Sequence, residues 1–440
     1  MRLWICALLI TLIGLLAFGA VTPASTALAA ACTANASPGN VQQKINNASS
    51  GAVICLGAGT YDVRLFVNGK SNLTLRGAGW NSTIVRDGPT NNTCLLVRDS
   101  HNIRFERMEA RACHVQAAFV ADSTNVVFSA IEANNGPIGF QYRNSTGTII
   151  GSQAHGQNKP NGAGFGAIIQ QSSNVQIQDS TFEDIRGFGI LSQFNSRLHV
   201  GNTNVWDNRD GGVFTIHKTG KTTIGGSRIS RNKQNVFAGE PGCAPLPAGN
   251  PNPPQCYLNN PGKYYSQIEV SIQNSTIGGA RSAGVVIFPG VHATLRNNAI
   301  QNSHLTGLFA WGAVVDAAGD DYVHNRENAA ECRAYPAPAT GYRGMCKLVG
   351  EHMHHSTPLS GGQLGGGFVS EGAKVKLLNS KIENNWGIGV ALLHNATGEV
   401  RNNVIRYNGG SGLCIKNAGP ISISGNSIYG NRPGYCLGHP

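Results

Sequence analysis

The sequence predicts an all-β protein, a parallel β-solenoid in which one short unit repeats along most of the chain. Within each unit apolar residues alternate with period two, and the unit recurs mostly every 23 or 24 residues. This period fits neither a heptad nor a helical repeat. The 440 residues include 57 glycines and only 13% charged residues, a composition typical of turn-rich β-structure. A leucine-rich repeat has a similar length, but its Leu-rich consensus is absent.

The repeating unit has the form apolar-x-apolar-x-x-Ser/Asn-x-apolar, as residues 175–182 and 270–277 show. The second apolar residue marks each unit, at Ile103, Val126, Ile149, Ile177, Val200, Ile224, Ile272, Leu295, Leu377, Val400 and Ile423. Stacked as coils, equivalent residues lie about 4.8 Å apart. We expect about 10–13 coils, with stacked asparagines such as Asn385 and Asn408 bonded along the stack.

The N-terminal residues 1–30 are typical of a secretory signal peptide. Arg2 precedes an apolar run over residues 3–18, and small residues follow at 27–31. The run is shorter than the roughly 20 apolar residues of a membrane span, although an N-terminal anchor is the alternative. We therefore expect residues 31–440 to form a single secreted domain, extracellular or periplasmic, without a membrane span after signal removal. Apolar spacing over residues 40–48 predicts a short helix that caps the first coil.

Cysteine use agrees with export. Ten cysteines remain after residue 30, and an even number in an exported chain indicates disulfides. Their order favours five local pairs: Cys32 with Cys55, Cys94 with Cys113, Cys243 with Cys256, Cys332 with Cys346, and Cys414 with Cys436. No cysteine or histidine spacing is typical of a zinc site. We expect no metal or other cofactor, with calcium as the alternative.

The chain is basic, with 34 Lys and Arg residues against 23 Asp and Glu residues and a net charge of +11. A basic exported protein favours an anionic partner: an acidic polysaccharide, an anionic cell wall or lipid headgroups. We expect a monomer that meets an anionic polysaccharide and no nucleic acid. Two interruptions of the repeat, at about 235–266 and 312–366, are expected to be functional or protective insertions.

The opening of the repeat region resembles a known superfamily. The segments 59–61, 72–79 and 83–85 read Gly-Thr-Tyr, Asn-Leu-Thr-Leu-Arg-Gly-Ala-Gly and Thr-Ile-Val. They are similar to the start of right-handed parallel β-helix, or pectate-lyase-like, proteins. The resemblance implies a single-stranded right-handed parallel β-helix, but no one function, because the superfamily contains lyases, hydrolases, esterases, epimerases and non-enzymatic binders. Signatures of polygalacturonases and mannuronate epimerases are absent, and the match of residues 114–119 to pectin methylesterases is weak.

Candidate site residues lie on the second strand of each coil, which usually begins with glycine. Counting from that glycine, one outward position carries Arg143, Gln170, Gln193, Ile216, Phe288, Trp311, Ser370, Leu393 and Lys416. The next position brings Glu371 and His394, which we expect to occupy equivalent places on successive coils. A line through Phe214, Phe288 and Trp311 is too apolar to lie bare in water, so either the insertions or sugar rings cover it.

The leading hypothesis is a polysaccharide lyase-type enzyme, whose elimination needs a base and a cation beside the uronate carboxylate. The predicted catalytic residues are His394, Glu371, His354 and His217. The predicted substrate-binding residues are Trp311, Phe288, Arg143, Lys218 and Lys416. The alternative is a non-catalytic cell-surface or glycan-binding solenoid. A glycoside hydrolase, with Glu371 and Asp320 or Asp321 as its carboxylates, or a uronate epimerase, is a further alternative.

Overall fold

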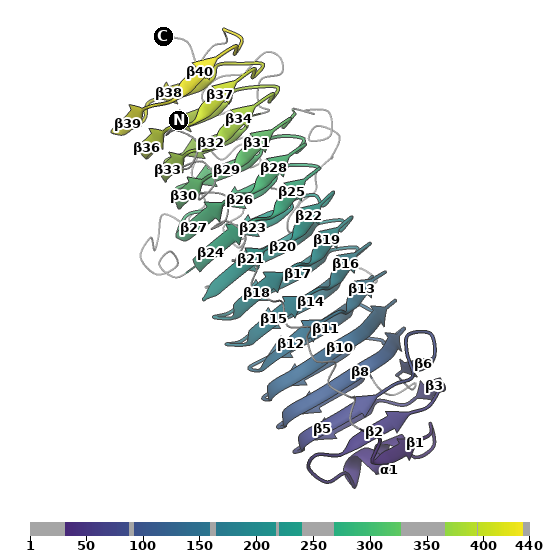
Figure 1. The fold of residues 1–440 in the computed structure, drawn as a ribbon. Coiled ribbons are helices and arrows are strands. Elements are labelled where there is room, and N and C mark those ends of the chain that lie inside the picture. Colours follow the sequence, from purple (N-terminus) through teal and green to yellow (C-terminus); the bar gives the residue numbers. More distant parts are fainter. Residues whose placement is uncertain are drawn as a thin grey trace, which may run out of the picture. The chain divides into compact units, whose positions relative to one another are not determined.

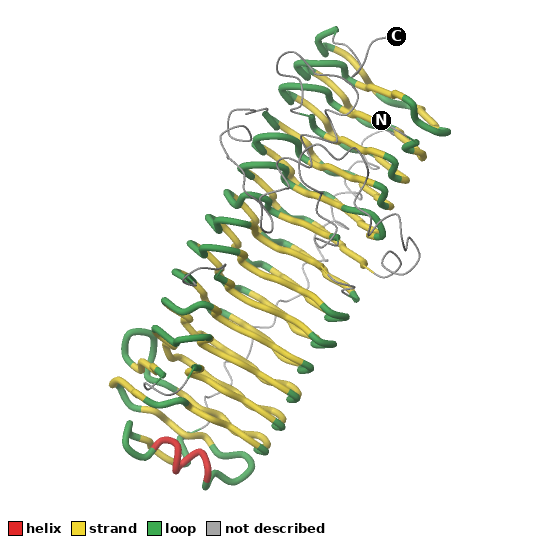
Figure 2. The backbone as a smooth tube through the Cα atoms, turned by 180° about the vertical axis from the view of Figure 1, so that it is seen from behind, coloured by secondary structure: helices red, strands yellow, loops and turns green. Residues whose placement is uncertain are grey.

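The computed structural model describes residues 31–87, 92–158, 164–216, 220–239, 268–326, 366–393 and 395–433. The described elements belong to one compact unit, Thr33–Pro440. The predicted signal peptide, residues 1–30, lies outside the described residues. Within the unit, parallel strands form coils that follow one another in chain order (Figures 1 and 2). This confirms the parallel β-helix predicted from the 23-residue period.

Thirteen strands, one from each of thirteen coils, form the smaller sheet. They are β4 (Leu65–Asn68), β7 (Thr93–Arg98), β9 (Gln116–Ala121), β11 (Ile138–Arg143), β14 (Phe165–Gln170), β17 (Phe188–Gln193), β20 (Gly211–Ile216), β23 (Val236–Ala238), β26 (Val285–Ile287), β29 (Leu308–Trp311), β32 (Phe368–Glu371), β35 (Val390–Leu393) and β38 (Leu413–Lys416). Every pairing between them is parallel, so equivalent residues are stacked along the sheet.

The larger sheet has 27 strands and consists mainly of two parallel rows. It starts with β1 (Ala34–Ala36), β2 (Val53–Leu56), β3 (Gly59–Asp62), β5 (Ser71–Arg76), β6 (Thr83–Arg86) and the long strands β8 (His101–Arg111) and β10 (Thr124–Asn134), which span both rows. The first row continues with β12 (Thr146–Ile150), β15 (Asn174–Gln178), β18 (Arg197–Gly201), β21 (Lys221–Gly225), β24 (Ile268–Gln273), β27 (Val291–Arg296), β30 (Val314–Ala318), β33 (Lys374–Leu378), β36 (Thr397–Arg401) and β39 (Ile421–Ser424). The second continues with β13 (Gln153–His155), β16 (Thr181–Glu183), β19 (Asn204–Trp206), β22 (Arg228–Ser230), β25 (Thr276–Gly278), β28 (Ala299–Gln301), β31 (Asp321–Val323), β34 (Lys381–Glu383), β37 (Val404–Arg406) and β40 (Ser427–Tyr429).

The strand register confirms most of the predicted repeat. Ile177 pairs with Val200, and Val200 pairs with Ile224, as the 23- and 24-residue steps require. One step was wrong by two residues, because Ile149 pairs with Phe128 and not with Val126. Both Val126 and Phe128 lie in the long strand β10 and both are fully buried, so apolar spacing alone could not choose between them.

The predicted insertions were too long at their N-terminal ends. Residues 236–238 form β23, which pairs with β20, so the first interruption begins after this strand. Residues 314–318 and 321–323 form β30 and β31, a complete further pair of rows. Ala317 pairs with Leu295 on one side and with Leu377 on the other. Because alanine is a weak apolar marker, the sequence pattern did not reveal this coil. Residues 240–267 and 327–365 lie outside the described residues.

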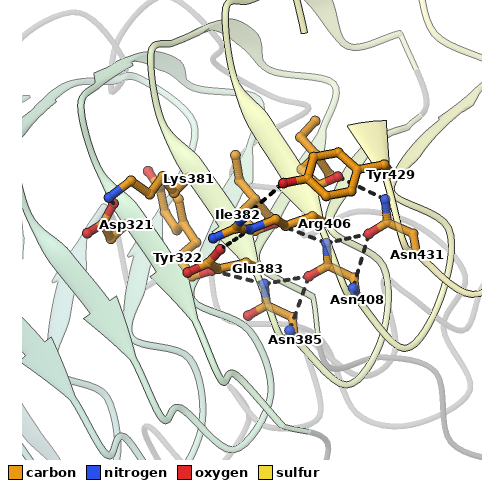
Figure 3. A network of polar contacts seen from close by, with 11 residues as sticks. Asp321, Tyr322, Lys381, Ile382, Glu383, Asn385, Arg406, Asn408, Tyr429 and Asn431 are labelled. Atoms are coloured by element: carbon orange, nitrogen blue, oxygen red, sulfur yellow. Dashed lines mark hydrogen bonds and ion pairs between the residues drawn. The ribbon is translucent and has the colours of Figure 1, made fainter. Parts of the chain in front are cut away.

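The interior of the coils is a continuous apolar core that contains Ile177, Val200 and Ile272 among its buried residues. At the turns that lead from the second row of the larger sheet into the smaller sheet, asparagine side chains form the predicted ladder (Figure 3). Asn408 Nδ2 donates to Asn431 Oδ1 at 2.8 Å, and Asn385 Nδ2 donates to Asn408 Oδ1 at 2.9 Å. These bonds satisfy buried turn groups that apolar packing alone would leave unpaired.

The N-terminal helix and one disulfide also agree with the predictions from the sequence. The predicted helix is α1 (Val41–Asn46), which buries Val41 and Ile45 against the start of the stack. Cys94 and Cys113 form a disulfide with a Cα separation of 5.8 Å. Cys32, Cys55 and Cys414 are also disulfide-bonded; Cys436 and the two predicted pairs in the insertions lie outside the described residues. No helix in the described part of the chain is long and apolar enough to cross a membrane.

Candidate functional site

The outward face of the 13-stranded sheet carries two lines of stacked side chains. Val97, Val120 and Tyr142 belong to the core, so the residues on either side of each point outward. We call one the Phe66 line: Phe66, Leu96, Phe119, Gln141, Ile168, Leu191, Phe214, Phe237, Val286, Phe309, Val369, Ala391 and Cys414. We call the other the Arg98 line: Asn68, Arg98, Ala121, Arg143, Gln170, Gln193, Ile216, Phe288, Trp311, Glu371, Leu393 and Lys416.

The N-terminal part of the Arg98 line is polar. Arg98 is exposed, and Arg143, Gln170 and Gln193 are half-buried. The Arg143 guanidinium carbon lies 5.2 Å from the centre of the Phe119 ring, a cation–π distance. Gln193 Nε2 donates to Gln170 Oε1 at 2.9 Å, which fixes the two amides in one plane along the stack. We call Arg98, Arg143, Gln170, Gln193 and Phe119 the arginine–amide strip.

The two arginines of this strip are electrostatically uncompensated. Within the described residues, neither Arg98 nor Arg143 has a carboxylate within ion-pair distance. The turns after β7 and β9 carry Asp99 and Asp122, and Asp122 accepts a hydrogen bond from Asn144. Some arginines of the larger sheet are paired, as Arg76 is with Glu106 at 2.7 Å, whereas Arg197 and Arg228 are exposed there and have no ion pair among the described residues. Positive charge is therefore left over on the outward face of the smaller sheet.

The middle of the face is an aromatic stack. Phe214 lies 5.0 Å from Phe237, Phe237 lies 5.2 Å from Phe288, and Phe288 lies 5.7 Å from Trp311, between ring centres. Phe288 is only 1% exposed, whereas Trp311 is half-buried. These residues form a second apolar cluster, separate from the core. The predicted line of aromatic side chains is therefore present, and Phe214 and Phe288 in it are buried. Of the two aromatic residues predicted to bind substrate, Phe288 and Trp311, Trp311 presents more surface to a ligand.

The C-terminal part of the face corrects one predicted register. Glu371 pairs with Leu393, not with His394, and follows Trp311 in the Arg98 line. The error came from three successive glycines, because Gly367 and not Gly366 is equivalent to Gly389. Ser370 is fully buried and pairs with Ala310 of the core, so Ser370 is not the outward residue that the sequence predicted. Lys416 ends the line and is half-buried.

Four predicted site residues lie outside the described residues: His217, Lys218, His354 and His394. Their roles stay predictions. Their sequence positions remain informative, since His217 directly follows Ile216 and His394 directly follows Leu393, both in the Arg98 line. Both histidines therefore adjoin the outward face in sequence.

The carboxylates proposed to join Glu371 in hydrolysis lie on the larger sheet. Asp321 is in β31 and lies 3.8 Å from Lys381. Asp320 is fully buried, and Asn298 donates to its Oδ1 from both the backbone and the side chain. Burial raises the pKa of Asp320 to about 6, against the opposing hydrogen bonds of Asn298. Among the described residues no cluster of three or more His, Cys, Asp or Glu side chains could hold a metal ion.

Sequence reasoning missed Arg98 and Phe119. Counting began at strand-opening glycines, and β7 and β9 have Cys94 and Ala117 at that place. The 23-residue step from Phe119 to Leu96, and the pairing of Arg98 with Ala121, would have extended both lines toward the N-terminus. The signal was present in the two apolar runs of residues 95–97 and 118–120, which are one 23-residue step apart.

Comparisons with known proteins identify the fold family of the chain. The mannuronan C-5 epimerase AlgE6 A-module of Azotobacter vinelandii matches with 14% identity over 89% of this chain and 95% of that one, at a TM-score of 0.49. The surface adhesin PfbA of Streptococcus pneumoniae matches at 11% identity over 90% and 88%, with a TM-score of 0.46. Pectate lyase Pel9A matches at 14% identity over 71% and 83%, with a TM-score of 0.38. Similarities this distant carry no information on activity.

No curated protein matches the sequence. The model of the right-handed β-helix region, however, matches residues 65–239 and 262–439, which is most of the chain. Together with the parallel coils and the two stacked sheets, this match shows that the chain belongs to the right-handed β-helix family.

Proposed function

We propose that the protein binds an anionic polysaccharide along the outward face of the 13-stranded sheet. The observation that carries the proposal is the pair Arg98 and Arg143, which stand in one line without an ion-pair partner among the described residues. A uronate carboxylate can supply the missing anion through charge-assisted hydrogen bonds. The amides of Gln170 and Gln193 both donate and accept, which suits sugar hydroxyls.

The spacing of these groups suits a chain that runs along the coil stack. Arg98 and Arg143 are two interstrand steps apart, roughly 10 Å. The residue between them in the Arg98 line is Ala121, which is fully buried, so the two guanidinium groups are the polar groups that a ligand can reach at this end of the line. Phe119 is buried beneath the Arg143 guanidinium and supports that cation through a cation–π contact.

We further propose that the protein is exported and acts as a monomer. The Cys94–Cys113 disulfide supports export, because structural disulfides persist in oxidising compartments. The basic net charge supports an anionic partner there.

Calorimetric titration of the full chain tests the binding proposal. Homopolyuronate fragments should bind, and neutral glucan fragments of the same length should not. Arg98→Gln and Arg143→Gln should each weaken polyuronate binding about tenfold, the size of one charge-assisted hydrogen bond. Arg197→Gln is the matched control, since Arg197 is exposed on β18 of the larger sheet. Equal binding of neutral and anionic chains, or unchanged binding by both variants, would refute the proposal.

A second proposal is that the same face catalyses β-elimination, favoured by the two histidines that adjoin the Arg98 line in sequence. A neutral imidazole takes the C5 proton of a uronate, and the C5–H electrons form the C4–C5 double bond. The C4–O bond breaks, and the leaving oxygen takes a proton. Arg143 would stabilise the carboxylate-linked anion that develops. His394, His217 or His354 would be the base, with Lys218 and Lys416 as further cations and Trp311 as a stacking surface.

Ultraviolet absorbance of unsaturated uronates tests the elimination. Wild-type protein should release unsaturated ends from a polyuronate, and His394→Ala or His354→Ala should abolish this release while binding persists. If no polyuronate yields unsaturated ends and binding remains intact, the protein is a binder and the elimination proposal falls. Product analysis also separates the remaining alternatives, since hydrolysis gives saturated ends and epimerisation leaves chain length unchanged.

A further inference from the structure

A column of basic residues runs along the turns that lead from the second row of the larger sheet into the 13-stranded sheet. Six successive coils contribute Arg186, Arg209, Lys233, Arg281, His304 and Arg326. The backbone nitrogens of all but Lys233 donate to the preceding turn in the same way. Arg209 N donates to Ile185 O at 2.8 Å, and Arg326 N donates to Ser303 O at 2.7 Å. The column residues are therefore stacked at equivalent positions. We call them the basic column.

The arginines of the basic column face solvent without neutralising partners. Arg186, Arg209, Arg281 and Arg326 are exposed. In the described part of the chain none of the four has a carboxylate within ion-pair distance, and Arg186 contacts only the side-chain oxygen of Asn158. Five interstrand steps of about 4.8 Å separate the first from the last, so the column extends over roughly 24 Å. Four exposed arginines repeated along this length match a polymer that repeats its anions along the chain.

Three of these arginines converge on one cavity of about 400 Å³, which Arg186, Arg209 and Arg281 line together with Gln157 and Asn158. Two carboxylates, Asp184 and Asp207, also line it. Asp207 is already paired with Arg231 at 2.6 Å, and that guanidinium lies 4.5 Å from the Trp206 ring. The cavity therefore retains surplus positive charge beside the Asn158 side chain, whereas the Gln157 amide is buried and bonded to Gly136 and Ala133.

The next position of the column is an exposed tryptophan. Trp386 N donates to Asn325 O at 2.9 Å, in the same pattern as the basic residues, and its side chain is 62% exposed. An indole held in water at the end of a cationic track is a stacking surface for a sugar ring. A phosphate polymer without rings would make no use of it. The aromatic end therefore selects a sugar-based polyanion over an inorganic one.

We infer that the basic column, together with Trp386, is a second binding track that takes a linear acidic polysaccharide with one carboxylate on each sugar, lying parallel to the coil stack. This track lies on the connecting turns and does not depend on the arginine–amide strip proposed above. Two parallel tracks would let the protein hold two stretches of acidic chain at once, which increases the effective concentration of each for the other.

Chain-length dependence of binding tests the track. Wild-type full-length protein is titrated with uronate oligomers of two to ten residues. Because the column extends over six coils, affinity should rise up to about six residues and then level off. The double variant Arg209→Gln/Arg281→Gln should lose about 30- to 100-fold in affinity for the longer oligomers, and its salt dependence should become shallower. The double variant Arg197→Gln/Arg228→Gln removes the same charge from exposed positions of the larger sheet and should bind normally.

Two further sets of variants separate loss of binding by the basic column from other causes. Arg209→Lys/Arg281→Lys keeps the charge and should recover most of the affinity, which separates lost binding from lost folding. Trp386→Ala should weaken uronate binding and leave inorganic polyphosphate binding unchanged. A basic-column variant that binds like wild type, while Arg98→Gln/Arg143→Gln does not, overturns the second track and leaves the proposed function standing. The reverse pattern overturns the proposed strip and leaves the track. Tighter binding of polyphosphate than of uronates would overturn the sugar assignment.

Discussion

Replacing Asn408 by alanine tests the ladder that holds the C-terminal coils together. The Asn408 side chain is 1% exposed and makes four hydrogen bonds. Nδ2 donates to Ile382 O at 3.0 Å and to Asn431 Oδ1 at 2.8 Å. Oδ1 accepts from the backbone and side-chain nitrogens of Asn385, at 3.1 Å and 2.9 Å. Alanine leaves the buried Asn385 backbone amide without an acceptor and removes three further hydrogen bonds, to the Ile382 carbonyl, Asn431 and the Asn385 side chain (Figure 3).

The unpaired Asn385 amide costs about 1–3 kcal/mol and each of the three other lost hydrogen bonds about 0.5–1.5 kcal/mol, so Asn408→Ala should destabilise the coils beside it by about 3–5 kcal/mol. In a repeat stack this loss appears as local opening, so native-state hydrogen exchange is the suitable assay. The Asn385 amide should lose most of its protection, while amides of the central coils keep theirs. Asn384→Gly is the matched control, because Asn384 is exposed at a φ of 57° that glycine adopts freely. A loss below about 1 kcal/mol for Asn408→Ala would refute the energetic role of the ladder.

Two other stability predictions concern the Cys94–Cys113 disulfide and the buried Asp320 carboxyl. Reducing the Cys94–Cys113 disulfide, or replacing both cysteines by alanine, should cost about 3 kcal/mol in urea unfolding, since the bond closes a loop of 19 residues; an unchanged midpoint would contradict this. Burial raises the pKa of Asp320 from 3.8 to about 6, so between these values the native state binds more protons than the unfolded state, and stability falls as pH rises. Asp320→Asn should remove this slope and gain about 3 kcal/mol over wild type at pH 7 but little at pH 4; a gain independent of pH would show that the carboxyl titrates normally.

The fold could be predicted because the repeat is encoded in single side chains. Ile177, Val200 and Ile224 each fill the same interior position, so their spacing along the chain equals the length of a coil. Prediction failed where the apolar marker residue of a coil could not be told from its neighbours in the sequence. Ala317 is too small to mark its coil, and β10 contains two buried apolar residues in the same alternation. Register at Glu371 failed for a related reason, since three adjacent glycines give no side chain from which to count.

The candidate site was less predictable, because a line across thirteen strands depends on the register of every coil. Arg143, Trp311 and Lys416 were found, since their strands open with glycine. Arg98 was not found, and the basic column was not noticed, because its members are single exposed residues in turns with no periodic apolar neighbour. Exposure and the absence of a carboxylate partner become visible only when the coils are stacked.

Arginine protection measures the central claim most directly. The full chain is treated with an arginine-specific dicarbonyl reagent, with and without saturating polyuronate, and the modified residues are quantified by peptide mass spectrometry. Arg98 and Arg143 should react in the free protein and be protected by the polyuronate, while a neutral glucan protects neither. Arg197, exposed on the larger sheet, should react equally in all three samples. Equal modification of Arg98 and Arg143 with and without bound polyuronate would contradict the assignment of the outward face as the polysaccharide-binding surface.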